Sequence, residues 1–194
     1  ARVAVLISGG GTNLQAIIDR LAAGELPHVE LALVVSSRKN AGGLDRADRA
    51  GIKHVYIGKE NFEQELIKLL DEHEIDIIVL AGFLKILSSD FVSRYPDRII
   101  NVHPSLIPSF CGDGFYGLRV HEAALSYGVK VTGATVHFVN EVTDGGKIIA
   151  QRAVDVKDGD TPEILQRRVM EEAEWKLLPE AVEKVAAEIV ARRG

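Results

Sequence analysis

The fold class is indicated by the stretch Arg2-Val3-Ala4-Val5-Leu6-Ile7-Ser8-Gly9-Gly10-Gly11-Thr12-Asn13. A short apolar run, typical of a buried strand, leads into a glycine-rich turn that opens a helix. The glycines let backbone N–H groups turn inward, and a helix N-terminus carries partial positive charge, so this turn is suited to bind a phosphate. The alternative is a tight turn that binds nothing. The turn matches neither G-x-G-x-x-G nor a Walker A loop.

Beyond this stretch, apolar runs alternate with amphipathic segments, which predicts βα units around a mostly parallel sheet. We expect strands at Arg2–Ile7, Val29–Ser36, Lys53–Ile57, Ile77–Leu80, Ile99–His103, Lys130–Val139 and Ile148–Val156. We expect helices at Asn13–Ala23, Gly43–Ala50, Phe62–His73, Ser88–Tyr95, Val120–Tyr127 and from Thr161-Pro162 toward Arg193, with a bend or break at Pro179. The last two strands flank Asp144-Gly145-Gly146 and are expected to pair antiparallel. Without repeats or linkers, residues 1–194 are expected to form one domain.

The composition restricts the class of protein. With 194 residues, 46% apolar and 26% charged, the chain is typical of a soluble globular domain. It contains neither an apolar run of roughly 20 residues, as a membrane helix needs, nor the layout of a signal peptide. Cys111 is the single cysteine and cannot form an internal disulfide, which favours a cytoplasmic location. The net charge of −5 argues against general nucleic-acid binding.

One candidate for catalysis is the strand that ends in Asn101-Val102-His103-Pro104. Alternation places Asn101 and His103 on one face, at the carboxyl end of a strand, where open α/β sheets build their sites. An amide and an imidazole there can donate hydrogen bonds to an oxyanion. The alternative is a structural His beside a strand-ending proline. The long loop Pro104–Gly117 that follows favours a functional role, because such loops are uncommon otherwise.

The second candidate is Asp144, in the turn Thr143-Asp144-Gly145-Gly146. Asp-Gly is good hairpin chemistry by itself, so a purely structural role is the strong alternative. If Asp144 lies near His103, its charge favours the imidazolium form. Cys111 has no His or carboxylate placed near it by sequence, and the histidines lack metal-ligand spacing. We therefore predict no metal.

Four segments, in order, carry a resemblance that runs along nearly the whole chain: Ile7–Ile17, Leu80–Leu87, Asn101–Pro108, and Val136–Val139 with Asp144–Gly146. Together they resemble the folate-dependent glycinamide ribonucleotide formyltransferase family of purine biosynthesis. The resemblance implies a Rossmann-like formyltransferase fold, with a mostly parallel central sheet, helices on both faces and an antiparallel C-terminal strand pair. The implied formyl donor is 10-formyltetrahydrofolate. The implied catalytic residues are Asn101 and His103, which polarise the formyl group, and Asp144, which supports the charged His.

The resemblance also implies binding residues. For the ribonucleotide phosphate and glycinamide these are Gly11, Thr12, Asn13, Leu14, Gln15 and Glu174. For the folate they are Lys59, Leu84, Lys85, Ile86, Leu87, Asn101 and Val139. The chain departs from the family at several positions. Lys59 stands where relatives carry Arg, which differs in hydrogen-bond geometry. Arg119 stands at a position that is often His, and the helix around Glu174 is one residue longer.

The expected partners are small molecules, namely glycinamide ribonucleotide and folate, with no nucleic acid or membrane and with a monomer or homodimer as the working state. The nearest alternatives are formyltetrahydrofolate hydrolases and methionyl-tRNA formyltransferases, which share the Asn-x-His motif and the catalytic Asp. The hydrolases usually add an N-terminal domain, and the tRNA enzymes add a C-terminal domain and a basic surface. A nucleotide-binding module without catalysis is the remaining alternative. It would keep the glycine turn but has no reason to bring Asn101, His103 and Asp144 together.

Overall fold

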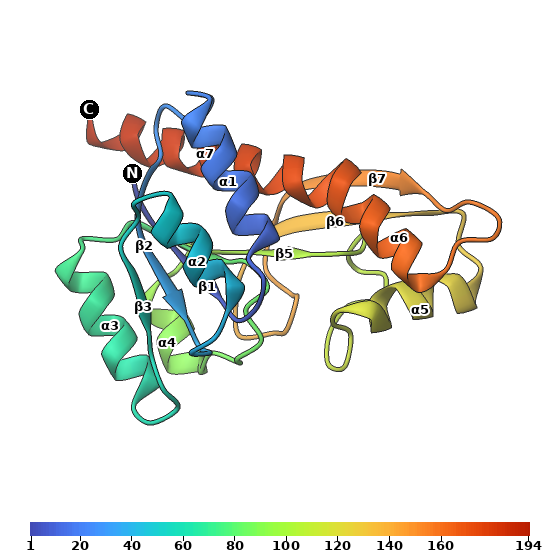
Figure 1. The fold of residues 1–194 in the computed structure, drawn as a ribbon, viewed down its shortest axis with the longest axis horizontal. Helices are drawn as coiled ribbons and strands as arrows, with labels where there is room; N and C mark the ends of the chain where they lie inside the picture. Colours follow the sequence, from blue (N-terminus) through green and yellow to red (C-terminus); the bar gives the residue numbers. More distant parts are fainter.

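One sheet organises the molecule. The computed structural model describes residues 1–194, and its strands follow the order β3-β2-β1-β4-β5-β6-β7 (Figure 1). The strands are β1 Arg2–Ile7, β2 Glu30–Ser36, β3 His54–Tyr56, β4 Ile77–Leu80, β5 Ile99–His103, β6 Val131–Phe138 and β7 Ile148–Asp155. Neighbours from β3 to β5 pair in parallel, whereas β6 pairs antiparallel with both β5 and β7. The predicted Rossmann-like class, with its antiparallel C-terminal pair, is confirmed.

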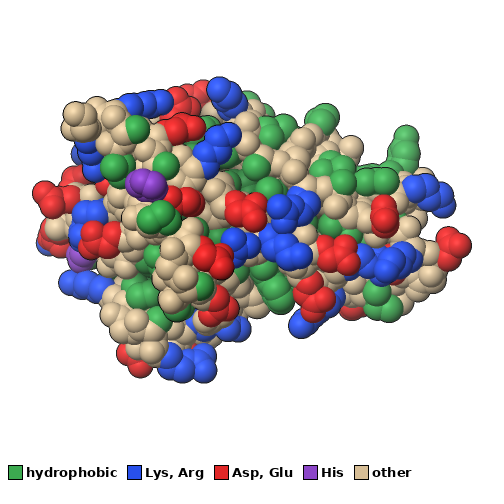
Figure 2. Space-filling view, turned by 90° about the horizontal axis from the view of Figure 1, so that it is seen from above, with side chains coloured by type: hydrophobic (Ala, Val, Ile, Leu, Met, Phe, Trp, Pro, Cys, Tyr) green, Lys and Arg blue, Asp and Glu red, His purple; other side chains and the backbone are tan.

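Helices cover both faces of this sheet. They are α1 Thr12–Ala22, α2 Gly42–Arg49, α3 Phe62–Glu72, α4 Ser89–Arg94, α5 Leu118–Tyr127, α6 Pro162–Val169 and α7 Trp175–Arg193. Figure 1 shows α1 and α7 along one face, with α3 and α4 on the other. Acidic and basic side chains are intermixed over the surface seen from above in Figure 2. None of the helices has the length and apolar character that a bilayer crossing requires.

The strand β1 shows why the apolar run predicted a central position. Val3, Val5 and Ile7 belong to a core cluster of 27 buried residues under α1 and α7, while Ala4 and Leu6 belong to a cluster of 15 under α3 and α4. All five are fully buried. A strand covered on both faces needs apolar side chains at every position, so its sequence reads as a continuous apolar run.

The C-terminal helix corrects one prediction. Thr161 caps α6 by accepting a hydrogen bond from the N–H of Ile164, as its sequence predicts. No break occurs at Pro179, which lies inside α7. The backbone instead leaves α geometry upstream, in a π-helical turn at Met170–Glu174. Because a π turn bonds each N–H to the carbonyl five residues back, it holds more residues per turn than an α turn.

Candidate active site

The strand β5 presents its polar side chains on one face. Ile100 and Val102 pack into the cluster beneath α7, so the alternating positions Asn101 and His103 face the other side. His103 is 4% exposed. On the neighbouring strand β6, His137 lies directly opposite Asn101.

Asp144 reaches this face from the connection between β6 and β7. Its Oδ2 lies 3.6 Å from Nδ1 of His103. The turn requires glycine, because a Cβ atom at Gly146 would lie 1.6 Å from the carbonyl oxygen of Phe138. Asp144 itself adopts a positive φ of 54°. The Asp-Gly-Gly sequence thus folds the connection back onto the sheet and brings a carboxylate to the histidine.

The Pro104–Gly117 loop contacts both His103 and Asp144. Nε2 of His103 donates a hydrogen bond to the carbonyl oxygen of Phe110 at 2.8 Å. The N–H of Gly112 donates to Oδ2 of Asp144 at 2.9 Å. Both contacts use backbone atoms, which sequence patterns do not reveal. Cys111 lies between these contacts, and burial together with the Asp144 charge raises the pKa of its thiol, so the thiol stays protonated.

Two further histidines lie beside the centre, and sequence reasoning assigned a role to neither. Nε2 of His137 lies 3.2 Å from Nδ2 of Asn101 and 3.9 Å from Oδ1 of Asp144. Burial lowers the pKa of His121 to about 4, and the nearby His103 acts in the same direction. His121 is therefore neutral at physiological pH. The contact between His137 and Asn101 follows from the antiparallel register of β5 and β6, which is a property of the tertiary structure.

These groups suit a specific kind of chemistry. The imidazole of His103 and the carboxylate of Asp144 lie 3.6 Å apart, and His137 connects this pair to the amide of Asn101. Such a group can stabilise charge developing on a carbonyl oxygen and can transfer a proton. No set of three or more His, Cys, Asp or Glu side chains is arranged to hold a metal ion.

The glycine-rich turn lies at the start of α1. Gly11 adopts a positive φ of 75°, and a Cβ atom there would lie 2.6 Å from Cα of Gly43 in α2. Arg46 of α2 braces the turn by donating to the carbonyl oxygen of Gly10 at 2.6 Å and to Oε1 of Gln15 at 3.3 Å. The close approach of two backbones explains why glycine is needed on both sides.

The predicted ribonucleotide residues separate into three groups. Thr12 and Gln15 line a cleft of about 630 Å³, together with Arg46 and Trp175. Leu14 is fully buried in the core, so only its backbone can face a ligand. Asn13 points across to the C-terminal helix.

Glu174 is the residue that Asn13 meets. Nδ2 of Asn13 donates to Oε1 of Glu174 at 3.4 Å. Glu174 ends the π-helical turn and is 6% exposed. Burial raises the pKa of its carboxyl to about 7, and the Asn13 hydrogen bond opposes this only in part. Near neutral pH this carboxyl therefore changes charge.

Four of the predicted folate residues, Leu84–Leu87, follow β4. Leu84 and Ile86 are 56% and 87% exposed, which leaves apolar surface available to a ligand. The N–H of Leu84 donates to Oγ of Ser8 at 3.0 Å, so this segment is bonded to the residue that begins the glycine-rich turn. Nζ of Lys85 lies 4.8 Å from the ring centre of Phe62.

Leu87 and three further folate candidates remain, and one of them, Asn101, lies on β5 as described above. Leu87 and Val139 are partly buried against the cluster beneath α3 and α4. The N–H of Val139 also donates to the carbonyl oxygen of Ile99, which fixes it beside β5. Lys59 lies in the exposed turn before α3.

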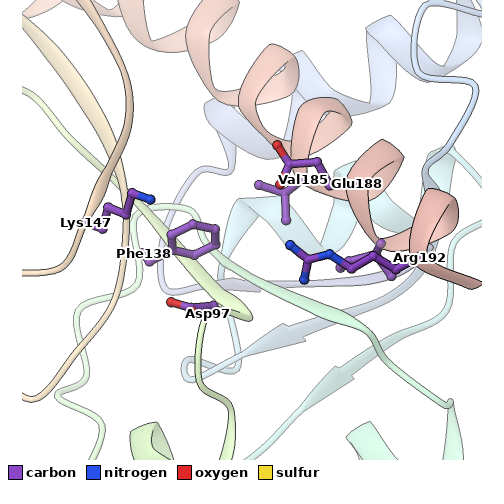
Figure 3. Close-up of a pocket in the computed structure, with 7 residues that line it drawn as sticks. Asp97, Phe138, Lys147, Val185, Glu188 and Arg192 are labelled. Carbon is purple, nitrogen blue, oxygen red and sulfur yellow. The ribbon is translucent and has the colours of Figure 1, made fainter.

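A separate pocket of about 170 Å³ opens beside α7. Figure 3 shows Phe138 at its centre, with Lys147 on one side and Arg192 of α7 on the other. None of the candidate site residues lines this pocket. The cleft beside the glycine-rich turn and the group around His103 therefore remain the candidate site.

Comparison with known proteins gives a consistent result. A family model described as formyl transferase matches residues 1–182. The human trifunctional purine biosynthetic protein adenosine-3 is 46% identical over 193 residues, which are 96% of this chain but 18% of that protein. Phosphoribosylglycinamide formyltransferase from Haemophilus influenzae is 39% identical over 92% of this chain and 84% of its own length. A crystal structure of glycinamide ribonucleotide transformylase 1 from Symbiobacterium toebii superposes with a TM-score of 0.88 at 41% identity, covering 96% of this chain and 88% of that one.

Proposed function

This chain belongs to the formyltransferase family, and from that membership we propose that it transfers the formyl group of 10-formyltetrahydrofolate to the amino group of glycinamide ribonucleotide. The products are formylglycinamide ribonucleotide and tetrahydrofolate, in purine biosynthesis. The observation that carries the proposal is the approach of Asp144 to His103, at 3.6 Å, on the face that Asn101 shares. A binding module without catalysis has no need of this arrangement.

The two substrates occupy adjoining parts of the site. The ribonucleotide phosphate binds at the start of α1, where Gly11 and Thr12 offer backbone N–H groups and the helix dipole adds positive potential. Its glycinamide end extends toward Glu174, whose charged form attracts an amine. The folate binds along Leu84–Leu87, with Lys59 and Val139 at the edges. Ser8 joins these two regions through its bond to Leu84.

The reaction proceeds by direct attack. The amine of the ribonucleotide attacks the formyl carbon, and negative charge develops on the formyl oxygen. His103 as imidazolium and the Asn101 amide donate hydrogen bonds to that oxygen. Asp144 sustains the charge on His103 and organises a water that accepts the amine proton. Collapse of the tetrahedral intermediate breaks the bond to the folate nitrogen, which takes up a proton as tetrahydrofolate leaves. Positioning the two reactants supplies much of the rate.

Residues 1–194 act together as one formyltransferase domain in this proposal. The working form is a monomer or homodimer in the cytoplasm, with small molecules as its partners and no metal, nucleic acid or membrane.

The test is an assay of tetrahydrofolate release. We expect release that depends on glycinamide ribonucleotide and yields its formylated product. Release without an amine acceptor would instead identify a formyltetrahydrofolate hydrolase. Formylation of methionyl-tRNA, with no turnover of the ribonucleotide, would identify the tRNA-directed enzyme. Ribonucleotide binding without any formyl transfer would identify a non-catalytic module.

A further inference from the structure

Two histidines flank one carboxylate in the catalytic centre. Nδ1 of His103 lies 3.6 Å from Oδ2 of Asp144, and Nε2 of His137 lies 3.9 Å from Oδ1. Both rings are almost fully buried, at 4% and 1% exposure. A single carboxylate can neutralise one buried positive charge, so the two rings are not expected to be charged together. The remaining hydrogen-bond partners of each ring distinguish them.

The partners of His103 suit a doubly protonated ring. A carbonyl oxygen can only accept, so Nε2 donates its proton to Phe110 at 2.8 Å. Nδ1 faces the Asp144 carboxylate, which is also an acceptor. A neutral ring would leave one of these two acceptors facing a nitrogen lone pair. The imidazolium satisfies both.

The partners of His137 suit a neutral ring. Nδ1 donates to the carbonyl oxygen of Phe138 at 2.9 Å. Nε2 lies 3.2 Å from the Asn101 amide nitrogen, which can only donate. Nε2 must therefore keep its lone pair as the acceptor. Burial lowers the pKa of His137, with His103 acting in the same direction, while the bond to Phe138 and the charge of Asp144 oppose the shift.

We propose that His137 is a positioning residue that orients Asn101 for the formyl oxygen. As the neutral tautomer protonated on Nδ1, it accepts one N–H of the Asn101 amide and leaves the second N–H for the developing oxyanion. This inference rests on the proposed function, because Asn101 acts on a formyl group only in a formyltransferase.

The orientation of an Asn amide needs such a partner. Its oxygen and nitrogen ends are nearly the same size, so packing alone does not decide which end lies where. A reversed Asn101 would place Oδ1 against the lone pair of His137, and two buried acceptors facing each other are costly. The β5–β6 register sets Asn101 opposite His137, which holds the pair at fixed separation. If His137 is neutral, the negative charge of Asp144 is paired with the positive charge of His103 alone.

The first test observes the ring protons directly. Long-range proton–nitrogen NMR spectra of the whole chain, labelled with ¹⁵N, report the tautomer of each histidine. We expect His137 to remain the neutral Nδ1–H tautomer throughout the neutral pH range. An imidazolium at His137, or the Nε2–H tautomer, would overturn the proposal. This readout needs no catalysis, so it decides the hydrogen-bond pattern even if the formyl-transfer assay fails.

The second test uses a matched pair of variants. His137→Leu removes the acceptor at similar size, whereas His137→Gln keeps a carbonyl oxygen within reach of the Nε2 position. We expect His137→Leu to lower kcat by about ten- to hundredfold, less than the loss of an oxyanion donor outright. We expect the KM of both substrates to change little. The Gln variant should recover most of the rate, which a purely structural role for the ring does not predict.

A double variant links this effect to Asn101. If His137 acts through Asn101, His137→Leu in an Asn101→Ala background should cause little further loss of kcat. Equal losses in the Leu and Gln variants, or full additivity with Asn101→Ala, would contradict the proposal. If either variant fails to fold, the NMR measurement on the unaltered chain still decides it.

Discussion

The glycine-rich turn and the catalytic centre are built from different atoms. The turn at Gly9–Gly11 presents backbone groups, and α2 braces it through Arg46 and Gly43. The centre around His103 and Asp144 depends on side chains, which backbone atoms of a neighbouring loop hold in place. The turn is therefore sensitive to a side chain added at Gly11, where a Cβ atom would meet Gly43. The centre is sensitive to losing one.

The largest expected effect comes from the side-chain centre. His103→Ala and Asp144→Ala should each lower kcat by at least about 100-fold, since loss of one oxyanion donor typically costs about 100- to 1,000-fold. Steady-state kinetics of both variants, with circular dichroism to verify folding, measure this. His54→Ala is the matched control, because His54 lies on the distant edge strand β3. Near-normal turnover in both catalytic variants would remove the basis for the assignment.

The second prediction concerns the backbone-built turn. Gly11→Ala forces a side chain into left-handed geometry and against Gly43, at a cost of about 1–2 kcal/mol from the conformation alone. We expect lower stability to urea and a KM for the ribonucleotide that rises more than kcat falls. Gly10→Ala is the control for stability, because no atom lies within 4 Å of a Cβ added there. Equal free energies of unfolding for the two variants would show that the contact with α2 is unimportant.

The smallest effect at neutral pH is expected at Glu174, between the two regions. Its raised pKa of about 7 leaves it roughly half protonated there. The ribonucleotide KM should fall as pH rises through about 7, when the charged carboxylate becomes available to an amine. Glu174→Gln should bind the ribonucleotide like the unaltered chain at acidic pH and more weakly at alkaline pH. A KM profile unchanged by the substitution would exclude this contact.

The raised pKa of Glu174 also predicts how stability depends on pH. Folding raises the pKa of Glu174 above its ordinary 4.5, so proton binding at this carboxyl favours the folded state. Its contribution to the free energy of unfolding is complete below pH 4.5 and is lost as pH rises through about 7. The Glu174→Gln side chain does not titrate, so the variant loses no stability from this position as the pH rises. The melting temperature of the Gln variant, relative to that of the unaltered chain, should therefore increase as the pH rises across this range. A constant difference between the two would contradict the buried position of the carboxyl.

Most of the fold could be predicted because it depends on local patterns. Continuous apolar runs such as Arg2–Ile7 follow from burial on both faces, and the Thr161-Pro162 pair marks the start of α6. The break predicted at Pro179 does not occur, although a proline usually interrupts a helix. The backbone instead departs from α geometry upstream, in the π-helical turn at Met170–Glu174.

The candidate site was predictable to a smaller extent. Asn101 and His103 could be paired from strand alternation, because their separation is two residues on one strand. Asp144 could not be placed beside them from spacing, since a hairpin Asp-Gly has an ordinary structural explanation. His137 lies in the Val136–Val139 segment that contributes to the family resemblance, but no role for it could be predicted from the sequence. Its contact with Asn101 follows from a strand pairing between segments far apart in the chain.

The sequence by itself determined the α/β class, the phosphate-suited turn and the residue types for oxyanion chemistry, because each depends on neighbours within one element. Only the tertiary structure decided which groups share a carboxylate. The antiparallel β5–β6 pairing, the returning turn at Asp144 and the loop carbonyl of Phe110 bring distant segments within hydrogen-bond or ion-pair distance. Protonation depends on those distances, so the different proton patterns inferred for His103 and His137 appear only after folding.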